Sequence, residues 1–193
     1  MHKGQGKRQI GRYIGEISEA LRALDARCIE RVLDTLESAY REGRAVFLVG
    51  NGGSAANASH FAQDLAKGTL ESATEKRFRV LSLTDNVPFL TAVANDLGYE
   101  NVFVFQLRQF ARSGDVLIAI SGSGNSPNVL KAAEWARANS VEVIGFTGFD
   151  GGKLGPLADV HANVPLMDMC QSEAVHSVLM HMIVDLLRKR LAE

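Results

Sequence analysis

The stretch that most constrains the fold of this chain is a short apolar run that ends in glycines and continues into an alanine-rich segment. Residues 45–49 read Ala-Val-Phe-Leu-Val, and Gly-Asn-Gly-Gly-Ser follows at 50–54. A continuous apolar run bounded by glycine is typical of a buried parallel strand. From Ala55 to Lys67 the chain contains neither glycine nor proline, which favours a helix. The sequence therefore predicts a strand, a tight turn and a helix in immediate succession.

A strand, a glycine turn and a helix in this order can bind an anion. Glycine lets the backbone approach a ligand closely, and the unpaired N–H groups of the first helical turn point towards it. The pattern is not a Walker loop, because no Gly-Lys-Ser/Thr follows, and the dinucleotide fingerprint fails at Ala55. We therefore expect no nucleotide cofactor. On this evidence alone, a simple tight turn in any α/β fold is an equally good interpretation.

A second unit of the same kind makes the anion site the better interpretation. Residues 115–120 (Asp-Val-Leu-Ile-Ala-Ile) predict another buried strand, and Ser-Gly-Ser-Gly-Asn-Ser-Pro follows at 121–127. Pro127 suits the first turn of a helix, which we expect to run to about Asn139. Serine hydroxyls add donors to the backbone N–H groups, so such a loop can hold a phosphate without a lysine.

The remaining segments alternate between strands and helices. Further strands are predicted at 79–83, 141–147 and 160–164, and helices at 86–94, 102–110 and 172–191, with a break at Asn95–Tyr99. Apolar residues at helical spacing over 9–42 predict two helices broken near Asp25, or one bent helix. The alternation predicts an α/β fold with a doubly wound, five-stranded parallel sheet. We expect one domain over residues 1–193, with helices at 1–42 and the sheet domain with its C-terminal helix at 43–193.

The charge and the cysteines limit the classes of function. The formal net charge is −1, so no basic surface indicates nucleic acid or membrane as a partner. No apolar run approaches the roughly 20 residues of a membrane span. The two cysteines form no CxxC pair, which is typical of reduced thiols. We expect a cytoplasmic protein.

Four titratable residues are candidates for chemistry. His60 and Asp64 lie four residues apart on one predicted helix, so they share a face and could bind a metal, handle protons or simply pair with each other. Glu173 and His181 lie on a mostly apolar helix, where a charge needs a partner. His176 is predicted to be the hydrogen-bond partner of Glu173, and His161 to lie at the surface. Eight residues of helix separate Glu173 from His181 by about 12 Å, so both could reach one metal only from opposite sides, through a distorted helix start, or from different subunits.

Together these segments resemble a sugar isomerase (SIS) domain, and within that superfamily the sedoheptulose-7-phosphate (phosphoheptose) isomerases. The resemblance rests on GNGGSAANASHF, TAVANDLGYE, GDVLIAISGSGNSPNVLKA and GFTGFDGGKL, in that order. It implies a flavodoxin-like fold and a homotetramer with active sites where subunits meet. It also implies an aldose–ketose isomerase of a sugar phosphate that moves a proton between C1 and C2, in lipopolysaccharide heptose biosynthesis.

The resemblance also assigns roles to individual residues. Substrate binding falls on Asn51, Gly52, Gly53, Ser54, Asn95, Asp96, Ser121, Gly122, Ser123 and Ser126. A divalent metal, with zinc the first choice and one per subunit, falls on His60, Asp64, Glu173 and His181. Asp64 stands where the family has Glu, and Glu173 where it has Gln. We expect Asp64 or Glu173 to be the base and His181 the acid, with all four side chains converging on one pocket.

Two other functions stay open at this point. One is a non-catalytic SIS module that binds a sugar phosphate or associates with the DnaA replication initiator, which the segments at 54–62 and 90–96 also resemble. The other is a sugar-phosphate-sensing regulator, although no DNA-binding segment accompanies the domain. His181 favours the enzyme, because the initiator-associating family lacks this histidine.

Overall fold

The structure, a computed structural model, describes residues 3–69 and 76–192. Its centre is a parallel sheet of five strands in the order β2-β1-β3-β4-β5. The strands are β1 (Ala45–Val49), β2 (Arg79–Ser82), β3 (Val116–Ser121), β4 (Glu142–Gly148) and β5 (Val160–Val164). This order is that of flavodoxin-like folds, whose ligands bind beyond the carboxyl ends of the strands. The predicted fold class is confirmed.

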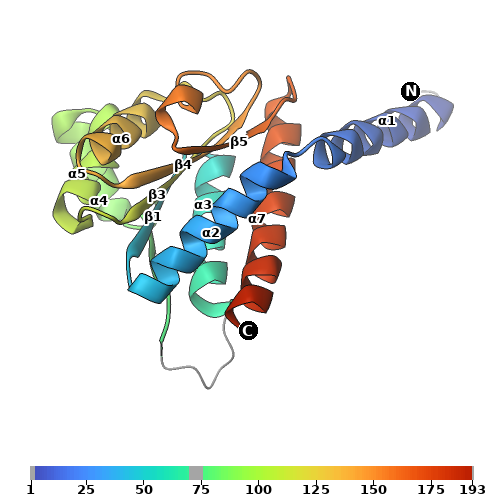
Figure 1. Ribbon diagram of the computed structural model, residues 1–193. Helices are drawn as coiled ribbons and strands as arrows, with labels where there is room; N and C mark the ends of the chain where they lie inside the picture. Colours follow the sequence, from blue (N-terminus) through green and yellow to red (C-terminus); the bar gives the residue numbers. More distant parts are fainter. Residues whose placement is uncertain (1–2, 70–75, 193) are drawn as a thin grey trace.

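Helices cover both faces of the sheet (Figure 1). One face packs against α2 (Ala26–Glu42), α3 (Gly53–Lys67) and α7 (Met169–Leu191). The other packs against α4 (Val87–Leu97), α5 (Val104–Phe110) and α6 (Pro127–Ala138). The pleat explains how a fully apolar strand serves both layers: Val46 and Leu48 of β1 join the first core, and Phe47 joins the second. Because α3, α4, α6 and α7 each follow a strand, helices of both layers begin at the loops that follow the strands.

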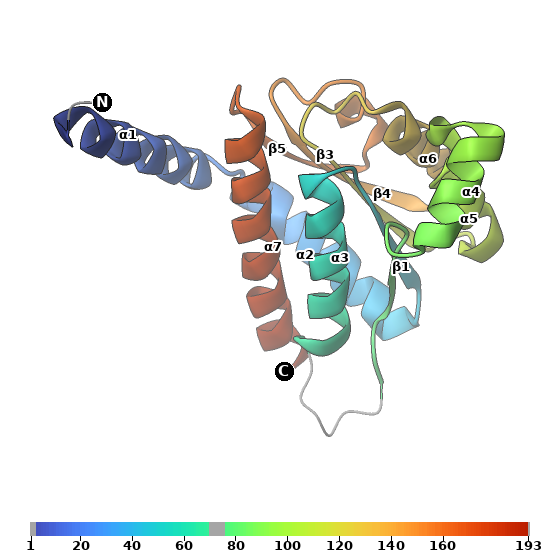
Figure 2. The same ribbon diagram turned by 180° about the vertical axis from the view of Figure 1, so that it is seen from behind.

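Helix α1 (Lys3–Arg22) packs on the body only near its C-terminal end, where Ala20 joins Val164 and Val175 in a small apolar cluster. The rest of α1 projects from the body (Figures 1 and 2). Its apolar stripe there is exposed: Ile10 by 63%, Tyr13 by 43% and Ile14 by 58%. The predicted break lies at Asp25, whose carboxylate accepts the N–H of Arg27 at 2.9 Å and caps α2. Of the two alternatives for residues 9–42, two helices is the correct one.

The predicted break over Asn95–Tyr99 contains the end of α4, but its first residues are still helical. Asn95 and Asp96 lie in the last turn of α4, which continues to Leu97 and stops at Gly98. Gly98 has φ 93°, a conformation that glycine adopts readily and other residues rarely. A 3₁₀ turn, η1 (Tyr99–Asn101), follows it, and a second, η2 (Gly155–Leu157), lies between β4 and β5. The backbone at Gly98 therefore ended the helix, and the polar pair before it did not.

Within residues 3–69 and 76–192, no helix is long and apolar enough to cross a bilayer.

Candidate active site

A cavity of about 240 Å³ opens where the loops after β1 and β3 meet. Ten residues line it: Asn51, Gly52, Ser54, Ile120, Ser121, Gly122, Ser123, Ser126, Met169 and Glu173. The expected substrate-binding residues of both loops are among them, apart from Gly53, which lies between two of them. No lysine or arginine is among the lining residues, so an anion held here depends on hydroxyls and backbone N–H groups.

Two helices begin at this cavity without a side-chain cap. Gly52 before α3 and Ser126 before α6 make no side-chain hydrogen bond to the helix start, although on α6 Asn128 Oδ1 accepts the N–H of Val129 at 3.0 Å. By contrast, Asp25, Asn86 and Asp168 cap α2, α4 and α7. Uncapped N–H groups carry the positive end of the helix dipole and bind anions. The convergence of two such ends on a serine-lined cavity is the arrangement that a phosphate group requires.

Glu173 lies against the start of α3. A Cβ added to Gly53 would lie 2.1 Å from Glu173 Oε2, so the carboxylate rests directly on this glycine and any side chain there would displace it. The backbone carbonyl of Glu173 accepts a hydrogen bond from Asn57 Nδ2 at 3.1 Å, which ties α7 to α3. The carboxylate therefore belongs to the anion cavity in this chain, at the positive end of α3.

A pair of asparagines joins the two loops, and sequence reasoning missed half of it. Asn51 Nδ2 donates to Asn128 Oδ1 and Asn128 Nδ2 donates to Asn51 Oδ1, both at 2.8 Å. The Tyr99 hydroxyl also donates to Asn51 Oδ1, at 2.9 Å. Asn128 is only 1% exposed. A buried amide directly after the helix-starting Pro127 was the available signal for Asn128. No signal pointed to Tyr99.

We expect Asn128→Ala to weaken sugar phosphate binding without slowing the chemical step. It removes both amide contacts to Asn51, so the loop after β1 loses its link to α6. KM should rise by about tenfold with kcat unchanged, as for loss of buried hydrogen bonds. Asn139→Ala is the matched control, since Asn139 contacts only Trp135 O at the other end of α6. Additive effects of Asn51→Ala and Asn128→Ala on KM would contradict the coupling.

His60, Asp64 and His181 form a second cluster, further along α3 and α7, which lie side by side (Figure 2). Asp64 Oδ2 is 3.4 Å from His60 Nε2 and 3.5 Å from His181 Nε2. The two imidazole rings meet edge to face with centroids 4.9 Å apart. Both histidine side chains are about half exposed, at 50% and 54%, and Asp64 is 21% exposed. The cluster thus faces outward from the chain.

The donor set of this cluster suits a divalent cation. The ligand atoms of the three residues all lie within 4.8 Å of one another. The nitrogen–oxygen distances exceed those of an ordinary N–H···O hydrogen bond, so the carboxylate and imidazoles are not closed on one another. Two imidazole nitrogens and one carboxylate oxygen are the ligands that catalytic zinc sites use.

Glu173 does not join this cluster within one chain. Eight residues of α7 separate it from His181, a rise of about 12 Å along an unbroken helix. Of the four side chains expected to converge, the structure brings three together and places the fourth in the anion cavity. Asn95 and Asp96 lie on the surface of α4, where Asn95 Nδ2 donates to Asp96 Oδ1 at 2.7 Å, outside the residues that line the cavity.

The other two predictions about histidines are wrong. His176 is fully buried, and its Nε2 donates to Thr147 O at 3.0 Å, so it holds α7 on β4 and does not pair with Glu173. His161 is partly buried, with its Nε2 2.7 Å from Thr147 Oγ1. Burial lowers the pKa of both imidazoles. Both are structural, and neither belongs to the cavity or to the cluster.

Comparison with known proteins places this geometry in a family. The SIS domain profile matches residues 11–148, and the chain belongs to the SIS domain family. Curated relatives include the phosphoheptose isomerase of Helicobacter hepaticus, 39% identical over 165 residues that cover 86% of this chain and 83% of that protein. The phosphoheptose isomerase of Mycobacterium tuberculosis is 45% identical over 150 residues, 78% of this chain and 76% of that protein.

Solved structures give the same result. Phosphoheptose isomerase GmhA from Neisseria gonorrhoeae superimposes with a TM-score of 0.86 at 30% identity, covering 97% of this chain and 98% of that one. The phosphoheptose isomerase from Francisella tularensis also has a TM-score of 0.86, at 27% identity, over 98% and 99% of the two chains.

Proposed function

We propose that this chain is a phosphoheptose isomerase, an aldose–ketose isomerase that converts sedoheptulose 7-phosphate to D-glycero-D-manno-heptose 7-phosphate. One observation carries the proposal: α3 opens at its N-terminus onto a serine-lined anion cavity and carries, further along, a His–Asp pair that meets His181. The curated phosphoheptose isomerases named above support the same activity. A non-catalytic SIS module has no use for His60, Asp64 and His181 in one outward-facing cluster.

In this proposal the phosphate group binds in the anion cavity. Ser121, Ser123 and Ser126 donate hydroxyl hydrogen bonds, while Gly52, Gly53, Ser54 and Gly122 offer backbone N–H groups. Asn51 orients the first loop. The Asn95–Asp96 pair contacts sugar hydroxyls at the rim, which is supported by the nearby Tyr99 reaching Asn51.

The acid and base act at C1 and C2 of the open-chain sugar. A carboxylate takes a proton from C1 of the ketose while His181 protonates the oxygen at C2, which gives an enediol. Returning a proton to C2 and removing the one on the C1 hydroxyl gives the aldose, with atoms and charge balanced. Asp64, which lies beside both imidazoles, is one candidate base, and Glu173 is the other.

A divalent metal, with zinc the first choice and one per subunit, would be held by His60, Asp64 and His181 and would polarise the substrate carbonyl. A carboxylate that binds a metal is a weaker base. With the metal present, Asp64 and His181 would be ligands and Glu173 the better base, because a metal-bound imidazole nitrogen cannot donate a proton; His181 acts as the acid in the metal-free site.

We also propose a homotetramer in which each active site combines two chains. The half-exposed His60 and His181 face outward from one chain, about 12 Å along α7 from the Glu173 of the same chain. If Glu173 of the partner subunit reached this cluster, the anion cavity of one chain would adjoin the acid–base cluster of another. The exposed stripe on α1 supports assembly. In this proposal residues 1–193 act as one SIS domain, and the two free cysteines support a cytoplasmic location.

The experiment is isomerisation of sedoheptulose 7-phosphate in deuterated water, followed by NMR. We expect the aldose product and incorporation of solvent deuterium at the carbon that receives the proton. Ser121→Ala and Ser126→Ala should each raise KM by about tenfold, since each removes a hydrogen bond to a charged group. Ser38→Ala, whose hydroxyl contacts Glu42 far from the cavity, is the control. No product and no solvent exchange from the wild type, with or without added zinc, would refute the proposal.

A further inference from the structure

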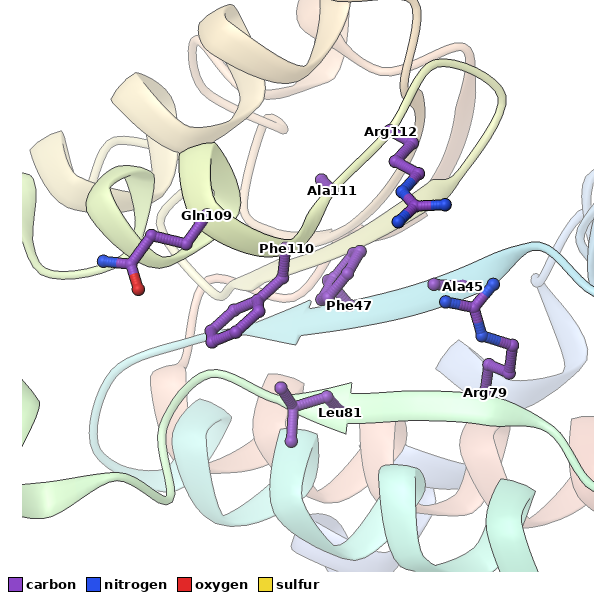
Figure 3. A pocket seen from close by; sticks show the side chains of 8 residues that line it. All are labelled: Ala45, Phe47, Arg79, Leu81, Gln109, Phe110, Ala111 and Arg112. Atoms are coloured by element: carbon purple, nitrogen blue, oxygen red, sulfur yellow. The ribbon is translucent and has the colours of Figure 1, made fainter.

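A larger hollow lies away from the candidate active site, on the face of the sheet that α4, α5 and α6 cover. Its volume is about 570 Å³. Eight residues line it: Ala45, Phe47, Arg79, Leu81, Gln109, Phe110, Ala111 and Arg112 (Figure 3). Ala45 and Arg79 are the first residues of β1 and β2, so this groove begins at the end of the sheet opposite the phosphate-binding loops. None of its residues belongs to the cavity or cluster described above.

The groove is open because β2 is an edge strand with only one face covered. The covered face of β2 packs against α3. On the open face, Leu81 in the middle of the strand is 44% exposed. Phe110, at the end of α5, is 52% exposed and points towards Leu81 across the groove, with the buried Phe47 behind them (Figure 3). Three large apolar side chains therefore form a wall of a size that suits a ring system.

One end of the groove carries positive charge. Arg79 and Arg112 extend towards Ala45 from opposite sides (Figure 3). Arg79 Nη1 donates to Gly43 O at 3.0 Å, which fixes its position. The nearby Asp115 carboxylate accepts the backbone N–H groups of Ala45 and Arg112 at 2.7 and 2.8 Å. Among the ion pairs of residues 3–69 and 76–192, none involves Arg79 or Arg112.

We propose that this groove binds a small amphipathic anion: an apolar ring system against Phe47, Leu81 and Phe110, with one acidic group between the guanidinium groups of Arg79 and Arg112. The volume lies within the range of small-molecule sites, which are mostly apolar with a few placed polar groups. A guanidinium group can form paired N–H···O hydrogen bonds with two oxygens of a carboxylate, sulfonate or phosphate. Helix α1, through which we propose assembly, projects from the side of the molecule away from α4 and α5 (Figures 1 and 2).

The test is a calorimetric and NMR titration of the whole protein with naphthalene-2-sulfonate. We expect saturable binding of one molecule per chain, with shifts at Leu81 and Phe110. Arg112→Ala and Leu81→Thr should each weaken it by about tenfold, the first by loss of a charged hydrogen bond and the second by loss of apolar contact. Arg108→Ala and Leu97→Thr are matched controls: Arg108 lies over the Phe105 ring on α5, and Leu97 is equally exposed on α4. Both should stay within about twofold of the wild type.

Two further titrations test the charge preference of the groove and its independence from the phosphate-binding cavity. The neutral 2-naphthylmethanol should bind about tenfold more weakly than the sulfonate, and the Ser121→Ala variant, which is changed only in the serine loop, should bind the sulfonate with unchanged affinity. Equal affinity for the neutral compound, loss of sulfonate binding in Ser121→Ala, or full affinity in both Arg112→Ala and Leu81→Thr would each overturn the proposal. So would the absence of saturable binding, which is also the result expected if another copy of the chain covers the groove. None of these outcomes depends on the isomerase activity.

Discussion

Alanine in place of His181 is expected to lower kcat for the isomerisation by about a thousandfold, within the range that general acid–base catalysis contributes. His181 Nε2 lies 3.5 Å from Asp64 and its side chain is half exposed, so it is open to substrate and is not needed to fill the core. The melting temperature should therefore change little. Steady-state kinetics with sedoheptulose 7-phosphate, together with a thermal melt of the same preparation, makes the measurement.

The control for this variant is Asp185→Asn, one turn further along α7. The Asp185 carboxylate accepts hydrogen bonds from Arg188 and Lys189, both at 2.7 Å, and these bonds lower its pKa. The carboxylate is therefore paired with these two basic side chains and not with the cluster, and its loss should leave kcat within about twofold. Full activity of His181→Ala would rule out this residue as the acid.

Glu173→Gln then separates the two candidate bases. If Glu173 removes the C1 proton, the neutral amide should cost about as much in kcat as the loss of His181. If activity is retained, Glu173 is a ligand or a spectator and Asp64 is the base.

The sequence was sufficient for the loops after β1 and β3, because these two strands are unbroken apolar runs that end in glycine or serine. The other three strands were predicted from their alternation with helices. Asp25 was also readable, since an aspartate between two apolar stripes is a strong N-cap signal. The end of α4 was not readable in the same way. Asn95 and Asp96 favour a turn in general, but α4 continues through both of them to Leu97. The backbone conformation that stops the helix is that of Gly98.

The structure does not group the candidate site residues as the sequence predicted. Resemblance put His60, Asp64, Glu173 and His181 in one set, whereas helix geometry already implied that Glu173 and His181 lie about 12 Å apart in one chain. His176 was misassigned because sequence spacing alone cannot show that its Nε2 faces the Thr147 carbonyl across a layer boundary. Contacts between distant segments, such as Tyr99 with Asn51, leave no periodic trace in the sequence.

Two aspartates on the exposed stripe of α1 are expected to dissociate the assembly and to remove activity with it. The variant is Ile10→Asp with Ile14→Asp, at positions that are 63% and 58% exposed on the projecting part of α1. If these side chains are buried between subunits, each contributes about 1.5–3 kcal/mol to the free energy of association. Losing both should therefore weaken association by more than about a hundredfold. Light scattering should show a tetramer for the wild type and a smaller species for the variant. The circular dichroism of the variant should stay that of a folded chain, since this part of α1 lies outside the core clusters.

The control for the α1 variant is Gln5→Asp with Gln9→Asp, which adds the same two charges to α1 off its apolar stripe. Activity is the second readout, because an active site completed by Glu173 of the partner subunit requires the assembly. A variant that is monomeric yet fully active would disprove the shared site and leave the chemistry to a single chain. A wild type that is monomeric at micromolar concentration would disprove the tetramer itself.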